Sequence, residues 1–265
     1  MNNYIKNFSL LSLSALALLG CKPEQSANTI QVGIIGGPQT KIMETAKQVA
    51  LKNYGLNIKV VEFSDYIMPN TALNDGNLDA NIFQHQPYLN AAIKAKSYAL
   101  TAIAKTFVYP MGVYSNKITH LDKLPNKAVV AIPNDPSNEA RALIMLNKMG
   151  LITLKAGKGT DATTLDIVSN PKNLQIKELD AAQIPRVLAD VTLAVINDDY
   201  AIPAGLSNDN ALYVEEKDSP YANIIVARTA DRDNPKLKQL IAAMHSAEVI
   251  QTTKEITKGQ AIQAW

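Results

Sequence analysis

The chain has 265 residues, of which 47% are hydrophobic and 19% are charged, and its formal net charge is +2. This composition can fill one large core or two small ones, and the near-neutral charge argues against a nucleic-acid partner or an anionic surface. Cys21 is the only cysteine, which excludes a disulfide within the chain and a thiolate metal site.

Residues 1–20 are typical of a secretory signal peptide. Lys6 supplies their only charge, and the apolar run at 8–19 is too short to span a membrane as a helix. Leu18-Leu-Gly-Cys21 resembles the lipobox of bacterial lipoproteins, which implies cleavage before Cys21 and a lipid on its thiol. Residues 21–28 have the polar composition of a linker. We therefore expect a lipid anchor in a bacterial membrane, with the protein facing the periplasm or the outside; the choice of inner or outer membrane stays open.

The first part of the mature chain alternates strand and helix signals. Strands are expected at 29–35, 56–63 and 78–83, with a helix from Pro38 to Gly55 and a helical turn region at 66–74. This alternation predicts a largely parallel sheet. The Gly36-Gly37 turn lacks both the lysine pattern of a phosphate loop and the spaced glycines of a dinucleotide site, so no nucleotide or other cofactor is expected.

A crossover to a second unit is predicted at Pro110. This proline breaks an extended segment at 100–115, which follows a helix beginning at Pro87. Late in the chain, the extended segment at 223–228 is predicted to return to the first unit, and residues 235–257 are expected to be helical and to pack against that unit. Two crossings of this kind would form a hinge.

The second unit contains the helix with the most consistent end signals. Asp135 suits the N-cap position, Pro136 suits the first turn, and Gly150 lies beyond the end. Further strands are expected at 128–132, 173–178, 193–197 and 212–215, with a helix at 181–189. A second α/β unit follows from this pattern.

The stretch from Leu78 to Leu89 is the first candidate for a ligand site. Phe83, His85 and Tyr88 place three rings within six residues, and Pro87 stops a strand where a helix can begin. Side chains at such a junction sit on a rigid element and can face a cleft. By composition alone, the rings are as consistent with a buried core as with a ligand site.

Five motifs place this stretch in a wider pattern. They are Glu62-Phe-Ser-Asp-Tyr66 with Pro69-Asn-Thr-Ala-Leu73, Asp79-Ala-Asn-Ile-Phe-Gln-His-Gln-Pro-Tyr88-Leu89, Ile132-Pro-Asn-Asp-Pro-Ser-Asn138 with Arg141, Ala194-Val-Ile-Asn197, and Asp218-Ser-Pro-Tyr-Ala-Asn223. In this order they resemble the NlpA family of lipoproteins, and together they cover about residues 30–265. The resemblance implies a methionine-binding protein that serves an ABC importer.

The family resemblance also implies the fold and the partners. We expect a type II periplasmic-binding-protein-like α/β fold, with two α/β domains, two crossover segments and a ligand cleft between the domains. The expected domain limits are 29–110 with 226–265, and 111–225. The implied partners are methionine and the permease and ATPase subunits of the importer. No enzymatic activity is expected.

Eight residues are expected to bind the ligand. By the resemblance, Tyr66, Phe83, His85 and Tyr88 line an apolar slot, while Asn138, Arg141, Asn197 and Asn223 hold the amino-acid head group. The chemistry fits, because aromatic edges contact a thioether favourably, a guanidinium binds a carboxylate bidentately, and amides both donate and accept. Backbone donors near Asn138, at a helix start, would add to the carboxylate site. Loss of Arg141 or Asn223 is expected to reduce affinity but not stability.

Other interpretations stay open. The ligand could be a methionine dipeptide or another apolar amino acid, and an extracytoplasmic enzyme could use His85 with an acid. No histidine pair and no Gly-x-Ser-x-Gly motif occurs, so neither a metal site nor an esterase is expected. An adhesion role has no feature in its favour. Asp198 and Asp199 depart from the resemblance, which has neutral residues there, and adjacent acids at such a turn more often cap a helix.

Overall fold

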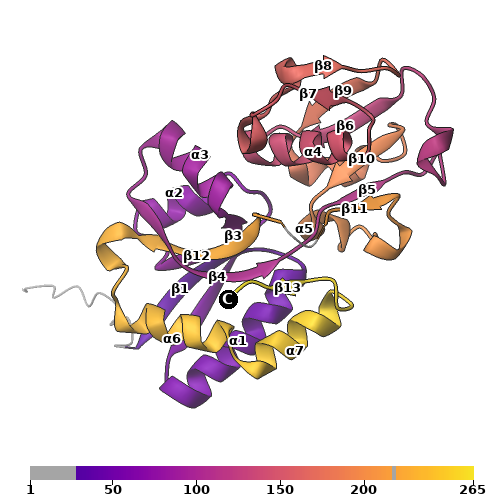
Figure 1. Cartoon of the computed structure of the whole chain (residues 1–265). Coiled ribbons are helices and arrows are strands. Elements are labelled where there is room, and N and C mark those ends of the chain that lie inside the picture. Colours follow the sequence, from indigo (N-terminus) through magenta and orange to yellow (C-terminus); the bar gives the residue numbers. More distant parts are fainter. Residues whose placement is uncertain (1–27, 217–218) are drawn as a thin grey trace, which may run out of the picture.

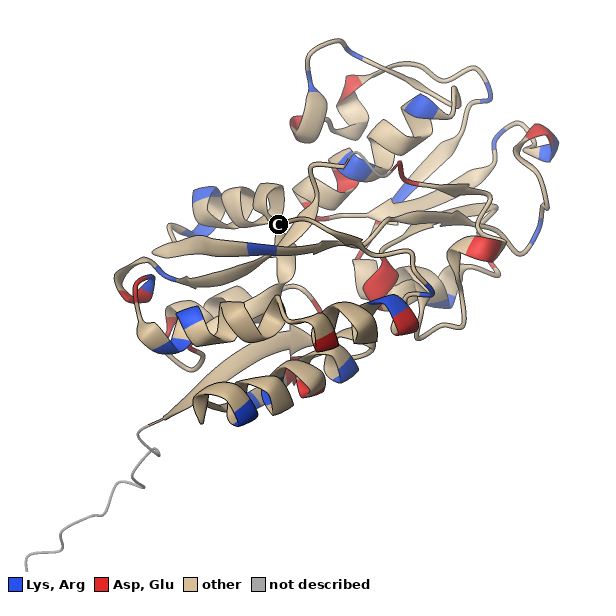
Figure 2. Ribbon diagram, turned by 60° about the horizontal axis from the view of Figure 1, so that its bottom comes forward, with Lys and Arg blue, Asp and Glu red and all other residues tan. Residues whose placement is uncertain are grey.

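The computed structural model describes residues 28–216 and 219–265, which form two lobes, each built around its own sheet (Figure 1). The predicted signal peptide of residues 1–20, the predicted lipidation site Cys21 and nearly all of the predicted linker lie outside the described residues. Within the described ranges, no helix is long and apolar enough to cross a membrane. Acidic and basic residues are interspersed along the ribbon of both lobes (Figure 2).

The first lobe contains a six-stranded sheet. In spatial order its strands are β13 (Ile262–Gln263), β4 (Leu100–Val108), β12 (Ala222–Arg228), β3 (Ala80–His85), β1 (Thr29–Ile35) and β2 (Asn57–Phe63). β1 is parallel to β2 and β3, as the strand and helix alternation predicts. β12 is antiparallel to β3 and β4, and β13 is antiparallel to β4, so the expectation of a largely parallel sheet is wrong for this half. The chain leaves the lobe after Val108 and re-enters beside it at Ala222, so β12 must run back along β4.

Helices cover both faces of this sheet. α1 (Pro38–Tyr54) packs on one face with α6 (Pro235–Met244) and α7 (Ala247–Ile256). α2 (Met68–Asn74) and α3 (Gln86–Lys96) contribute to a separate apolar cluster on the other. The helical tail expected at 235–257 is divided in two, because Ser246 caps α7 by accepting a hydrogen bond from the Val249 N–H.

The second lobe contains a five-stranded sheet. Its strands in spatial order are β11 (Tyr213–Val214), β5 (Gly112–Tyr114), β10 (Leu193–Ile196), β6 (Val129–Pro133) and β9 (Gln175–Leu179). α4 (Pro136–Lys148) follows β6 and is capped as predicted, with the Asp135 carboxylate accepting from the Asn138 N–H at 3.0 Å. The helix expected at 181–189 is a 3-10 helix at Ala181–Val187, since Pro185 cannot donate the backbone hydrogen bond of an α-helix.

Several short elements complete the second lobe and its margins. β7 (Thr153–Leu154) and β8 (Ile167–Ser169) form an antiparallel pair, which the sequence did not predict, and α5 (Asp198–Ala201) follows β10. Single 3-10 turns lie at Leu121–Lys123, Gly159–Asp161, Thr164–Asp166, Asn208–Asn210 and Thr229–Asp231.

Two segments connect the lobes, one between β4 and β5 and the other between β11 and β12 (Figure 1). The predicted domain limits place Asn223 in the second domain, whereas this residue pairs with His85 in the first sheet. The limits of 29–110 with 226–265, and of 111–225, otherwise stay our proposal. The two crossings bring the ends of β3, β10 and β12 toward the space between the lobes.

Candidate functional site

A cavity between the lobes is lined by all eight residues predicted to bind the ligand. They are Tyr66, Phe83, His85, Tyr88, Asn138, Arg141, Asn197 and Asn223. Four further residues line it: Gln84, Tyr109, Asp198 and Asp199. The space enclosed by these residues, counted together with the part open to solvent, is about 360 Å³. Of the four additions, Gln84 lies inside a recognised motif and Tyr109 directly precedes the predicted crossover.

The first lobe contributes what we call the aromatic wall, formed by Tyr66, Phe83, His85 and Tyr88. The Tyr66 and Phe83 rings stack at 5.8 Å between centroids, and Tyr88 meets both rings edge-on. The Tyr88 hydroxyl donates to the Tyr66 carbonyl at 2.8 Å, which fixes the ring within its own lobe. The wall is therefore held in place by its own contacts.

His85 connects the two lobes as a neutral ring. Its Nδ1 accepts a hydrogen bond from the Tyr88 N–H at 3.3 Å, so Nε2 carries the proton and donates to Asn138 Oδ1 at 3.2 Å. Burial, aided by the nearby Arg141 charge, lowers the pKa of His85 to about 3. With both nitrogens engaged and so low a pKa, the ring is poorly suited to act as a general base.

The second lobe contributes what we call the polar wall, formed by Asn138, Arg141, Asn197 and Asp198. Asn138 Oδ1 also accepts from Asn197 Nδ2 at 3.0 Å, and Asn138 Nδ2 donates to the Asp135 carboxylate at 2.9 Å. The backbone N–H of Asn138 is likewise taken by Asp135. The Asn138 N–H itself is therefore not available to a ligand, because the N-cap uses it; a contribution from other backbone donors at this helix start stays a prediction.

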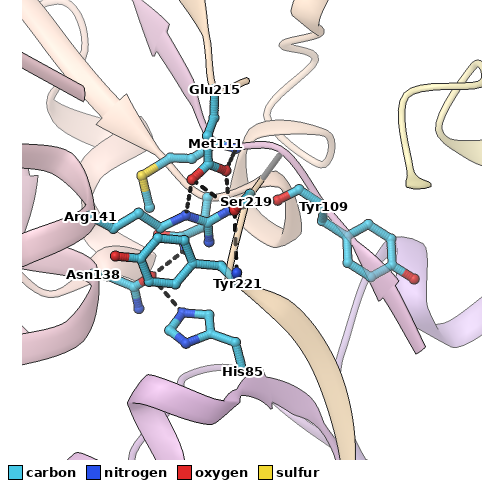
Figure 3. A network of polar contacts seen from close by, with 9 residues as sticks. His85, Tyr109, Met111, Asn138, Arg141, Glu215, Ser219 and Tyr221 are labelled. Carbon is cyan, nitrogen blue, oxygen red and sulfur yellow. Dashed lines mark hydrogen bonds and ion pairs between the residues drawn. The ribbon is translucent and has the colours of Figure 1, made fainter. Parts of the chain in front are cut away.

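Arg141 lies at the centre of a buried ion pair (Figure 3). Its Nε donates to Glu215 Oε1 at 2.9 Å, Nη2 donates to Glu215 Oε2, and Nη2 also donates to the Tyr109 carbonyl at 3.0 Å. The guanidinium carbon lies 4.5 Å from the centre of the Tyr221 ring. Nη1 makes no hydrogen bond within residues 28–216 and 219–265.

The ion pair changes what Arg141 is expected to do. Glu215 is held further by Met111 N–H at 3.3 Å and by the Ser219 hydroxyl at 3.2 Å, so removal of the guanidinium would leave a buried carboxylate without its cation. The ion pair therefore argues against the expectation that loss of Arg141 spares stability, and we predict a loss of stability instead. No sequence pattern pointed to Glu215, because a partner distant along the chain has no characteristic spacing.

Two neighbouring residues of the polar wall present buried oxygens without partners. Asn197 Oδ1 and Asp198 Oδ2 make no hydrogen bond anywhere in the described part of the chain. By contrast, Asp199 accepts from the Tyr66 hydroxyl of the other lobe at 3.0 Å. Asn197, rather than either aspartate, is the N-cap of α5, and its side chain makes no capping hydrogen bond; Asp198 and Asp199 lie in the first turn of the helix.

Burial shifts the acidity of both aspartates. Desolvation, reinforced by the neighbouring Asp199, raises the pKa of Asp198 to about 7. Desolvation also raises the pKa of Asp199 to about 6, opposed by hydrogen bonds from Tyr66 and Gln39.

The Asn223 side-chain amide, which lies across the cavity, makes no hydrogen bond to any residue that the structure describes. Only the backbone carbonyl of Asn223 accepts a hydrogen bond, from Thr106. The cavity thus combines a self-supporting apolar wall with several unused polar atoms.

No group of three or more His, Cys, Asp or Glu side chains suited to a metal ion occurs among residues 28–216 and 219–265.

Comparison with known proteins gives a consistent result. The chain is 47% identical to the D-methionine-binding lipoprotein MetQ of Salmonella typhimurium, over 96% of this chain and 95% of that protein. It is similar to the solved structure of an ABC transporter periplasmic substrate-binding protein from Coxiella burnetii, with 55% identity, a TM-score of 0.86, and coverage of 89% of this chain and 100% of that one.

A nutrient binding protein from Burkholderia cenocepacia, solved bound to methionine, is 48% identical, with a TM-score of 0.87 and coverage of 89% of this chain and 100% of that chain. The fold is thus that of a periplasmic substrate-binding protein with two α/β lobes. The model of the NlpA lipoprotein family matches residues 30–265, and the chain belongs to that family.

Proposed function

We propose that this protein is a lipid-anchored substrate-binding protein that captures methionine outside the cytoplasmic membrane and delivers it to an ABC importer. The observation that carries the proposal is the composition of the cavity: a wall of aromatic rings faces a polar wall in which Asn197 Oδ1 and Asp198 Oδ2 are buried without partners in the described residues. The names of the relatives describe binding and transport rather than catalysis, in agreement with this role.

Each part of methionine has a matching surface. The thioether would lie against Phe83 and Tyr88, since sulfur contacts with ring edges are favourable and need no charge. The carboxylate would lie near Arg141, where Nη1 is not used by the protein. Asn197 and Asn223 would complete the head-group site from opposite lobes. Closure of the lobes would then exclude water from the ligand.

The anchor and the transport partners follow from the family and from the N-terminal residues. Cys21 would carry the lipid, and acyl chains contribute about 0.8 kcal/mol for each buried methylene, so two or more chains hold a protein stably on a membrane. Permease and ATPase subunits would receive the ligand. Cell fractionation of the Cys21→Ser variant tests the anchor: the variant should become soluble, and its retention in salt-washed membranes would contradict a lipid anchor.

The ligand is tested by mass spectrometry of freshly purified, denatured protein. Methionine should be released in about one equivalent, and ligand-stripped protein should rebind it in calorimetric titration. A methionine dipeptide and leucine serve as comparison ligands in the same titration. Tighter binding of either one than of methionine would contradict the proposed substrate while leaving the binding-protein role in place.

A further inference from the structure

The charges around the cavity are unbalanced. Arg141 is the one cationic side chain that lines it in the described part of the chain, and Glu215 already neutralises that charge. His85 is neutral, because its pKa is lowered to about 3 by burial. Asp198 and Asp199 therefore add negative charge that no protein cation within the cavity offsets. The ammonium group of a zwitterionic or cationic ligand would offset this negative charge locally.

The two aspartates are not equivalent. The Asp199 carboxylate accepts a hydrogen bond from the Tyr66 hydroxyl at 3.0 Å. Asp198 is 4% exposed, lines the cavity and leaves Oδ2 without a partner in the described residues. Asn197 Oδ1, on the preceding residue, is also buried and unpartnered. Two adjacent acceptors, one of them anionic, match a group with several N–H donors and a positive charge, whereas a neutral or anionic group would leave the carboxylate unpaired.

We propose that Asp198 determines specificity by accepting the protonated α-amino group of the ligand, with Asn197 Oδ1 as a second acceptor. The inference rests on the proposed amino-acid binding function and adds a requirement to it: the ligand must carry a free, protonated amine. N-acylated methionine, or its analogue without the amine, would place no cation beside the carboxylate and would be rejected.

The requirement makes binding depend on pH. The titratable and charged groups that face Asp198 or share its cavity are Asp199, Arg141, Glu215, His85, Tyr66, Tyr88, Tyr109 and Tyr114. In the free protein, burial raises the pKa of Asp198 to about 7, so the carboxylate forms as the pH rises toward neutrality. An ammonium ligand binds the ionised form, and affinity should therefore rise from pH 5 to pH 7.5. The gain is at most about tenfold for each pH unit below the pKa.

The test is calorimetric titration of three ligand-stripped proteins: the parent, Asp198→Asn, and Asp190→Asn as a matched surface control. Each is titrated with methionine and with 4-(methylthio)butanoate, the analogue that lacks the amine. The parent and Asp190→Asn should prefer methionine, with affinity that falls toward pH 5. Asp198→Asn should bind methionine on the order of 10- to 100-fold more weakly than the parent at pH 7.5. It should also lose most of the preference for methionine over 4-(methylthio)butanoate, and its affinity should no longer depend on pH. Melting without ligand checks that this near-isosteric variant is folded.

The outcomes separate the two proposals. If Asp198→Asn retains the full preference for methionine and the parent pH profile, the role of Asp198 is wrong and the proposed function stands. The role of Asp198 is equally wrong if Asp199→Asn, and not Asp198→Asn, flattens the profile. If the parent itself fails to bind methionine at any pH, the proposed function fails, and the inference that depends on it fails as well.

Discussion

The aromatic wall and the polar wall face the same cavity, but they differ in how far their own contacts satisfy them. Tyr66 and Phe83 stack, Tyr88 meets both rings edge-on, and the Tyr88 hydroxyl is hydrogen-bonded within the wall. Asn197 and Asp198 each bury an oxygen that no described residue contacts by a hydrogen bond. Buried polar atoms without partners destabilise a protein, whereas packed rings stabilise it.

This difference assigns separate tasks to the two walls. The aromatic wall is complete before a ligand arrives, so it can set shape and size. In the proposed function, a charged head group completes the hydrogen bonds of the polar wall. Ligand binding should therefore stabilise the polar wall more than it stabilises the rings. Four measurements test this difference between the two walls.

The largest effect is expected for Arg141→Ala. The change removes a buried cation that binds Glu215, whose side chain is 10% exposed, and a carboxylate left without its partner in such a site costs up to about 3–5 kcal/mol of folding free energy. Methionine affinity should fall by orders of magnitude as well. Denaturant unfolding and calorimetry measure the two effects. Lys148→Ala, which breaks an exposed ion pair with Glu216 from the same helix, is the control and should change stability by no more than about 1 kcal/mol.

The next effect concerns pH and the stability of the ligand-free protein. The folded-state pKa values of Asp198 and Asp199, about 7 and about 6, lie above the value of about 3.9 for an unfolded aspartate. The folded state therefore binds more protons between these values, and stability falls as the pH rises from about 4 to about 7. The loss should be a few kcal/mol. Unfolding of parent and Asp198→Asn across this range measures it, and parallel profiles would contradict it.

Asn223→Ala separates affinity from folding. The Asn223 amide makes no hydrogen bond to the described protein, so its loss should shift melting of the stripped protein little. Methionine affinity should fall by roughly 1–3 kcal/mol, because a buried head group loses its partner. Two melts, with and without saturating methionine, measure both. Asn90→Ala, at an exposed position of α3, is the control; a full ligand-induced shift in Asn223→Ala would refute the head-group role.

The smallest effect is expected for Tyr66→Phe. This change keeps the stacked ring and removes one hydrogen bond between the lobes, from the Tyr66 hydroxyl to Asp199. Ligand-bound stability should fall by about 1–2 kcal/mol, and the ligand should dissociate faster. Stopped-flow release of methionine measures the rate. Tyr98→Phe, whose hydroxyl contacts Thr71 within one lobe, should leave the rate unchanged.

Local signals predicted much of the fold. Gly55 ends α1 and Asp135 caps α4, as expected, because capping depends only on neighbouring residues. The direction of β12 could not be predicted in this way, since it depends on where the chain re-enters the first lobe. The 3-10 helix at Ala181–Val187 could have been predicted from Pro185, because a proline inside a helix cannot donate the backbone hydrogen bond of an α-helix.

The candidate site shows a similar division. Motifs placed all eight residues in one cavity, because each motif lies at the end of a strand or the start of a helix. The motifs could not show that Arg141 forms an ion pair with Glu215, because nothing in the sequence distinguishes Glu215 from the other acidic residues among the 24 in the chain. Nor could they show that Asp198 lies unpaired in the cavity, because that depends on the packing of both lobes.

The position of β12 has a consequence for the order in which the protein can fold. β12 lies between β3 and β4 and pairs with both, yet it follows the whole second lobe in the chain. The second sheet uses only strands between Gly112 and Val214 and can close before β12 is available. Pairing between distant segments is slow, because the entropy of the intervening loop is lost first. A prefolded second lobe shortens that loop, so the lobe that begins the chain is the one that is finished last.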